Sequence, residues 1–123
     1  MAITRDDVTL MLQVEQTFGP SVEAKKFCWR DETSKLGADF FDKYGWDSDE
    51  RFYVNAVATW CEIYGMLWKN KLMAEEMVME WSPASHYWDQ LKGILLGARE
   101  ILADPELWIN FEAVAIAQKE RTA

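Results

Sequence analysis

One stretch, residues 51–71 (RFYVNAVATWCEIYGMLWKNK), limits what this chain can fold into more than any other. At about 100° per residue, its apolar side chains gather on one broad helical face, formed by Tyr53, Ala56, Val57, Trp60, Ile63, Tyr64 and Leu67. Phe52 and Trp68 flank that face, which makes it wider than a surface helix needs. On the opposite side, Ala58 and Gly65 are small enough for a neighbouring backbone to come close. We therefore expect a central, mostly enclosed helix of a bundle.

Capping residues and prolines divide the rest of the chain into helices. Thr4 is suited to cap a first helix, and Gly19-Pro20 separates that helix from the next. Asp47 or Ser48 is the expected cap of the central helix. The expected helices cover residues 5–18, 21–44 with a break near 34–37, 49–71, 72–81, 84–103, and a last one that starts at 104–106.

No run alternates between apolar and polar residues in the way that a half-buried strand does. The expected fold class is therefore all-α, a compact bundle of five to six helices around a central helix near residues 49–71. The length of 123 residues and the 50% hydrophobic content are typical of one globular domain, so residues 1–123 are expected to form a single helical domain. Gly93 and Gly97 share one helix face, where they allow close packing.

The charge of the chain argues against two classes of partner. The net charge is −8, and its 13 basic residues are scattered, with no run beyond Lys25-Lys26. Nucleic-acid backbones and anionic membrane surfaces both require concentrated Lys and Arg. No direct nucleic-acid binding and no membrane contact are therefore expected. Spanning a membrane needs about 18 or more consecutive apolar residues, which the chain lacks.

The chain shows little of the chemistry that enzymes and metal sites require. Its single histidine, His86, falls on the opposite helix face from Trp88, and a zinc site needs about four ligands. Glycine-rich phosphate loops are absent as well. Cys28 and Cys61 each sit beside a tryptophan on an expected helix, where a buried free thiol acts as a small hydrophobe. With no export segment at the N-terminus, they favour a cytoplasmic protein. We expect no enzyme and no cofactor.

Two charges fall on helix faces that are otherwise apolar or lined with small residues. Arg99 lies on the apolar stripe of the 84–103 helix, and Glu62 lies beside the small residues of the central helix. Charges in such places are costly unless they are paired. A structural salt bridge between Glu62 and Arg99 is predicted, with Glu112 as the alternative partner of Arg99.

The chain has seven tryptophans, and four of its methionines lie between positions 66 and 79. These side chains could belong either to the core or to a contact surface. Tryptophan and methionine fill cores, but both are also used at adaptable binding surfaces. The candidates for a pocket or a partner surface are Trp46, Trp68, Met73, Met77 and Trp81.

The succession LWKNKLMAEEMVMEW, followed by Trp88 and eleven residues later by Arg99, resembles a family of small bacterial and archaeal helical domains of unknown function. The resemblance covers roughly Phe52 to Phe111. It implies an α-helical fold and no established activity.

These patterns favour a non-enzymatic interaction or regulatory module that acts through protein contacts. One alternative is an acidic inhibitor, resembling a DNA mimic, that occupies a basic groove of a nucleic-acid-handling partner; clustered acids would favour it. The other is a binder of an apolar small molecule in a pocket lined by Trp and Met, which a closed pocket would favour.

Overall fold

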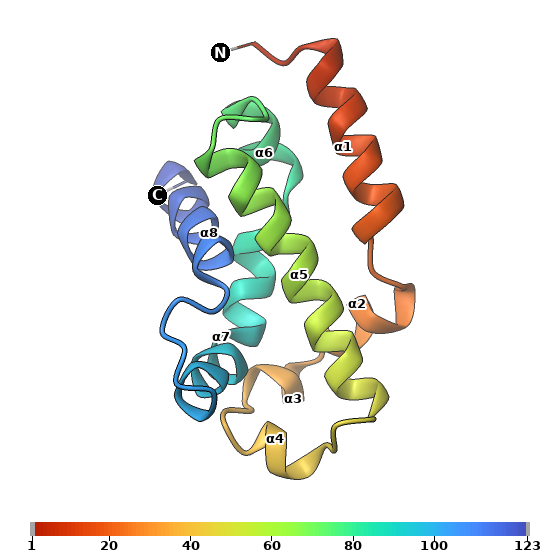
Figure 1. Ribbon diagram of the computed structural model, residues 1–123, viewed down its shortest axis with the longest axis vertical. Coiled ribbons are helices and arrows are strands. Elements are labelled where there is room, and N and C mark those ends of the chain that lie inside the picture. The colour runs from red at the N-terminus through yellow and green to blue at the C-terminus, as the bar shows by residue number, and fades with distance from the viewer. Residues whose placement is uncertain (1, 123) are drawn as a thin grey trace.

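The computed structural model describes residues 2–122, and this part of the chain forms eight helices and no strand (Figure 1). Helix α5, Asp49–Lys69, lies in the middle. Around it are α1 (Arg5–Phe18), α2 (Val22–Trp29), α3 (Asp31–Ser34), α4 (Phe40–Lys43), α6 (Glu75–Trp81), α7 (Ala84–Ile101) and α8 (Ile109–Thr122). The all-α fold class and the central helix near residues 49–71 are confirmed. The count is eight rather than five to six because the 21–44 region divides into three helices.

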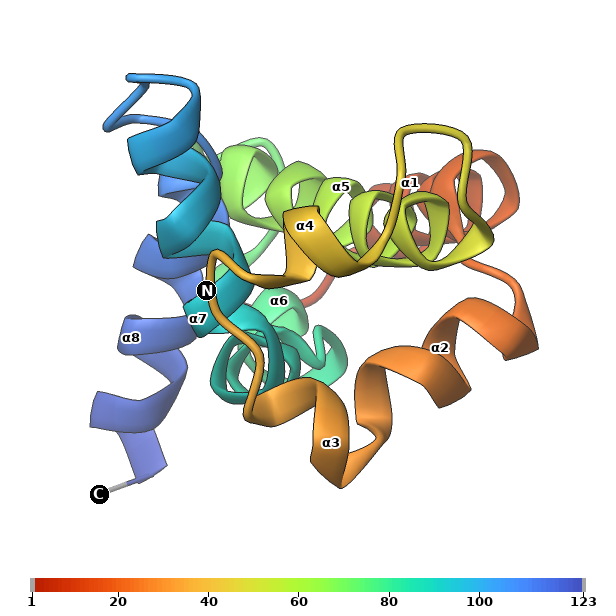
Figure 2. The same cartoon turned by 90° about the horizontal axis from the view of Figure 1, so that it is seen from below.

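The break near residues 34–37 is present, and it lets the chain pack closely against α7. A Cβ added to Gly93 would lie 2.4 Å from the carbonyl oxygen of Leu36, and one added to Gly97 would lie 2.8 Å from the Cα of Ala38. The interruption between α3 and α4 therefore packs directly on the glycine face of α7. A second break, not predicted, lies at Arg30, whose backbone is extended between α2 and α3. Figure 2 looks at the end of the molecule that carries α3 and α4.

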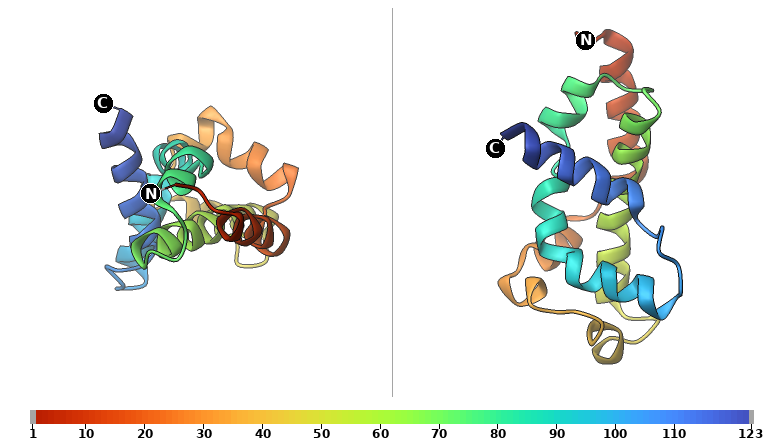
Figure 3. Two further views of the ribbon diagram at one scale, coloured as in Figure 1. Left: turned by 90° about the horizontal axis from the view of Figure 1, so that it is seen from above. Right: turned by 90° about the vertical axis from the view of Figure 1, so that its left-hand side faces the viewer.

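Helix α5 is enclosed because it packs with both large and small residues. Val57, Trp60 and Tyr64 are buried on its apolar face, while α1 and α8 lie against it (Figure 3). On the small-residue side, a Cβ at Gly65 would lie 2.2 Å from the carbonyl oxygen of Asn110. The start of α8 therefore approaches the backbone of α5 at a distance that only glycine permits.

Two polar contacts attach α1 to the rest of the core. The Glu15 carboxylate accepts hydrogen bonds from the indole of Trp60 at 2.6 Å and from the hydroxyl of Tyr64 at 2.8 Å. At the other end of α1, Asp7 forms a capping box with Thr4 and also accepts a hydrogen bond from the backbone N–H of Ala74 at 2.8 Å. One aspartate therefore caps α1 and fixes the start of α6.

Two helices end in left-handed residues that are not glycine. Lys71 follows α5 with φ 57°, and Ala103 follows α7 with φ 51°. Each end is closed by a hydrogen bond between residues five apart, from the Leu72 N–H to the Leu67 carbonyl at 2.9 Å and from the Asp104 N–H to the Arg99 carbonyl at 3.0 Å. These closures turn the chain sharply and shorten both helices relative to the expected 49–71 and 84–103.

Trp60 provides a test of the enclosed face of α5. The side chain is 5% exposed, so Trp60→Ala should lower the free energy of unfolding by about 3–5 kcal/mol, the range for deleting a buried large aromatic. Urea unfolding measures the loss. Trp46→Ala is the matched control, because Trp46 is 81% exposed and should change stability little. Equal losses in the two variants would contradict the burial of Trp60.

Asp7 provides a test of the contact between α1 and α6. Its pKa is lowered, first by the hydrogen bond from the Thr4 backbone and then by those from Ala74 and the Thr4 hydroxyl. A lowered pKa stabilises the fold above the unfolded value of about 3.9, and this contribution is lost as the pH falls through the folded pKa. The stability difference between wild type and Asp7→Asn should therefore shrink below about pH 4. Asp6→Asn, which removes none of these bonds, is the control for urea unfolding across that range. A difference between wild type and Asp7→Asn that stays constant with pH would contradict the prediction.

Candidate functional site

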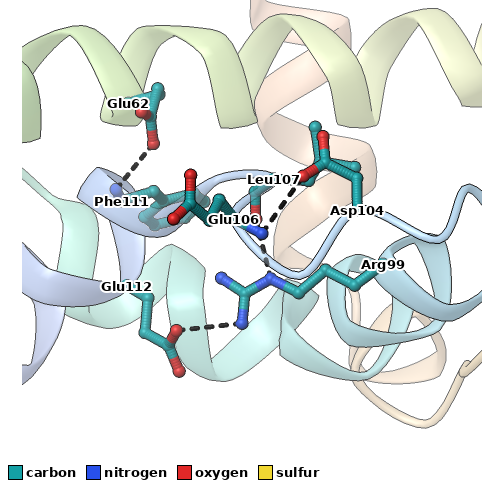
Figure 4. Close-up of polar contacts among 7 residues, drawn as sticks. All are labelled: Glu62, Arg99, Asp104, Glu106, Leu107, Phe111 and Glu112. Atoms are coloured by element: carbon teal, nitrogen blue, oxygen red, sulfur yellow. Dashed lines mark hydrogen bonds and ion pairs between the residues drawn. The ribbon is translucent and has the colours of Figure 1, made fainter.

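Arg99 and Glu62 bind different partners at the start of α8 and in the loop before it (Figure 4). The Nη1 of Arg99 pairs with Glu112 at 3.0 Å, and its Nε donates to the Leu107 carbonyl at 2.7 Å. Glu62 instead accepts hydrogen bonds from the Phe111 backbone N–H and the Asn110 amide, both at 2.8 Å. The predicted salt bridge between Glu62 and Arg99 is wrong, and the alternative partner Glu112 is confirmed. The reason is that the start of α8 lies between the two helices and gives each charge a partner of its own.

The last helix begins later than the sequence predicts for the same reason. Asp104 accepts a hydrogen bond from the Glu106 N–H at 3.1 Å, which makes a local turn, but α8 starts only at Ile109. A helix running on from residues 104–106 would join the Leu107 carbonyl to the Phe111 N–H. Arg99 and Glu62 take these two groups instead. The chain reaches α8 through Trp108, which has a φ of 61°.

The loop that results forms one wall of an open, largely apolar cleft of about 750 Å³. The other walls come from α4, α5 and the second half of α7. We call this the aromatic cleft. Four of its large apolar side chains are exposed to solvent, namely Trp46 (81%), Phe52 (67%), Ile101 (56%) and Leu102 (57%). The sequence placed Phe52 beside the buried face of α5, but the structure leaves most of its side chain open to solvent.

Arg51 fixes the shape of the aromatic cleft. Its guanidinium carbon lies 5.0 Å from the ring centroid of Phe41 and 4.7 Å from that of Trp46. The same guanidinium donates to the backbone carbonyls of Tyr44 and Phe41, each at 2.7 Å. These contacts hold the loop between α4 and α5 and keep Trp46 over the cleft by cation–π attraction.

Acidic residues crowd the two segments that line the cleft. Residues 39–52 carry Asp39, Asp42, Asp47, Asp49 and Glu50, and residues 98–108 carry Glu100, Asp104 and Glu106. The basic residues of the same segments are Lys43, Arg51 and Arg99, and Arg99 is already paired with Glu112. The segments that border the apolar floor are therefore acidic overall, and this acidic surround contributes Asp42 to the lining itself, beside Arg51.

The five surface candidates from the sequence do not form one surface. Trp46 belongs to the aromatic cleft, whereas Trp68 and Met73 line a depression of about 980 Å³ near the other end of α5. Met77 belongs to the hydrophobic core. Trp81 is half-exposed at the end of α6. Trp46 and Trp68 are separated by the length of α5, roughly 30 Å for a helix of this size.

Sequence analysis missed most of the residues that build the cleft. Arg51, Ile101 and Leu102 were not among its candidates, although apolar residues on both sides of the Asp104-Pro105 turn were a usable signal. Apolar side chains beside a turn have few neighbours to cover them. Their exposure depends on where α8 returns, which a helical wheel does not reveal.

Reactive groups do not gather in the described part of the chain. Cys28 and Cys61 are buried and unpaired; burial raises the pKa of Cys28 to about 12 and also raises that of Cys61. His86 is exposed on α7. Among residues 2–122, no group of His, Cys, Asp and Glu is placed to hold a metal ion.

The fold and the cleft define an all-α bundle with an open apolar surface. Residues 4–117 match the model of a family described as Domain of unknown function (DUF4760). The chain therefore belongs to this family, in agreement with the resemblance seen over residues 52–111. No curated protein and no solved structure matches it. Within the described residues, no helix has the length and apolar character needed to cross a membrane.

Arg99 provides a test of how the wall of the cleft is held. Arg99→Met and Glu112→Gln should show a coupling free energy of about 1 kcal/mol or more in a double-mutant cycle on unfolding. The cycle with Arg99→Met and Glu62→Gln should show weaker coupling, because those two side chains share no hydrogen bond. Stronger coupling to Glu62 than to Glu112 would contradict the assigned pairing.

Proposed function

We propose that this protein is a non-enzymatic interaction module that binds a helical, apolar and positively charged segment of a partner protein in the aromatic cleft. The observation that carries the proposal is the exposure of Trp46, Phe52, Ile101 and Leu102 around one cleft with an acidic surround. A contiguous apolar surface of this kind is costly in water and is typical of an interaction site.

The openness of the cleft favours a protein segment over a small molecule. Trp46 and Phe52 are more than half exposed, whereas a small-ligand site buries most of its ligand between its walls. Helix-in-groove recognition places apolar side chains spaced three and four residues apart into a groove of this type. Trp46, held by Arg51, supplies the rigid aromatic anchor that such interfaces commonly use.

The acidic surround predicts the charge of the bound segment. Asp42, Asp47 and Asp49 are exposed near the cleft, and opposite charges across an interface speed association and fix orientation. A segment with basic residues on its polar face meets this requirement. The clustering of acids here also supports the acidic-inhibitor alternative, in which the charges alone would hold a basic groove.

A reducing compartment such as the cytoplasm is part of the proposal. Cys28 and Cys61 are both free and buried, which is the usual state of cysteine in reducing surroundings. Neither thiol is needed for binding at the cleft.

A model peptide tests the proposed binding. The probe is a fluorescently labelled amphipathic helix of about 18 residues, with Leu on one face and Lys on the other. Its anisotropy should show saturable binding, and a peptide of the same composition in scrambled order should bind at least about tenfold more weakly, because it presents no apolar face. The double substitution Phe52→Ser and Leu102→Ser should weaken binding by about tenfold or more, as expected for central apolar anchors.

Leu12→Ser is the matched control, because Leu12 on α1 is 58% exposed and Leu102 is 57% exposed. The control should bind the peptide as the wild type does. The double substitution Asp47→Asn and Asp49→Asn separates the two functions. The proposal is supported if this variant loses little affinity for the peptide while Phe52→Ser with Leu102→Ser loses much. A large loss on neutralising the acids, with none from Phe52→Ser and Leu102→Ser, would favour the acidic inhibitor and refute apolar docking.

A further inference from the structure

A second depression, of about 570 Å³, lies where the end of α2 meets the first turn of α7. It is at the opposite end of α7 from the aromatic cleft. Its lining combines three cations, Lys25, Lys26 and Arg30, with three rings, those of Trp29, His86 and Tyr87. This composition is unusual on a chain whose net charge is −8.

The depression is built by contacts that fix its aromatic wall. Gln90 on α7 donates to the carbonyls of Cys28 at 3.1 Å and Arg30 at 2.9 Å, which ties the end of α2 to α7. The Trp29 ring then meets the rings of His86 and Tyr87 edge-on, with centroids 5.8 Å and 5.4 Å apart. Trp29 nevertheless remains 55% exposed, so much of its surface is open to a ligand.

The three cations are not neutralised by the protein. Across the described residues, none of them lies within salt-bridge distance of a carboxylate. Lys25 and Arg30 lie against aromatic rings instead, 5.1 Å from the centroid of Trp60 and 5.5 Å from that of Phe27. Three like charges that line one depression repel one another, and an anion placed among them would relieve that repulsion.

We propose that this depression binds a phosphorylated planar aromatic molecule, of which a mononucleotide is the class that fits. Trp29 offers a surface on which the base stacks. Lys26 and Arg30, both exposed, supply the donors that phosphate oxygens require. The other basic residues are scattered along an acidic chain, so the contact suits a single small anion rather than a long nucleic-acid backbone. The site is independent of the aromatic cleft.

Isothermal titration calorimetry with adenosine 5′-diphosphate tests the site. Saturable binding with a Kd below about 1 mM is expected. Adenosine and inorganic pyrophosphate are the two comparison ligands, and each should bind at least about tenfold more weakly, since each lacks one half of the recognised chemistry. The proposal would be overturned if adenosine 5′-diphosphate showed no saturable binding, or if adenosine or pyrophosphate alone bound as tightly as the nucleotide.

Two pairs of variants locate the binding. Lys26→Gln with Arg30→Gln should weaken nucleotide binding by about tenfold or more, whereas Lys69→Gln with Lys92→Gln, which removes the same charge elsewhere, should not. Trp29→Ala should cause a loss of similar size, and Trp46→Ala should cause none. All substituted residues are exposed, so circular dichroism should show that each variant stays folded. Equal losses in a variant and its control would place any binding outside this depression.

Discussion

The approach of α8 to the backbone of α5 is the constraint on which most of this structure depends. The carbonyl of Asn110 occupies the space that any side chain at position 65 would need. Backbone polar groups that are buried at such a contact need hydrogen-bond partners. Glu62 supplies one through the Phe111 N–H, and Arg99 supplies another through the Leu107 carbonyl. The loop that enters α8 is thereby fixed, and with it one wall of the aromatic cleft.

Features that depend on neighbouring residues in the sequence were predictable. Thr4 and Ser48 cap α1 and α5, and the small residue at Gly65 allows the close approach that its place on the helix predicts. Features that depend on distant partners were not predictable. The helical wheel put Glu62 and Arg99 on suitable faces, but it did not show that α8 would enter between them and take both charges. It also placed Phe52 near the core, although its side chain is 67% exposed at the cleft.

The two proposed sites divide the surface of α7 between opposite kinds of chemistry. Its second half contributes Leu95, Ala98 and Ile101 to an apolar cleft with acidic surroundings, while its first turn contributes His86 and Tyr87 to a cationic depression. The sequence carried a faint signal of the second site, because KKFCWR places bases and aromatic rings side by side at the end of α2. Only the fold brings that segment against α7, through Gln90.

The burial of both native thiols has a practical consequence. Cys28 and Cys61 are covered by protein and stay protonated near neutral pH, and thiol-reactive reagents attack only accessible thiolates. A cysteine introduced on the surface would therefore be the single reactive thiol of the folded chain, without removal of the native pair. Dyes or spin labels can thus be attached at one chosen position on an otherwise unaltered sequence, so that movements of the loops around α7 become directly measurable.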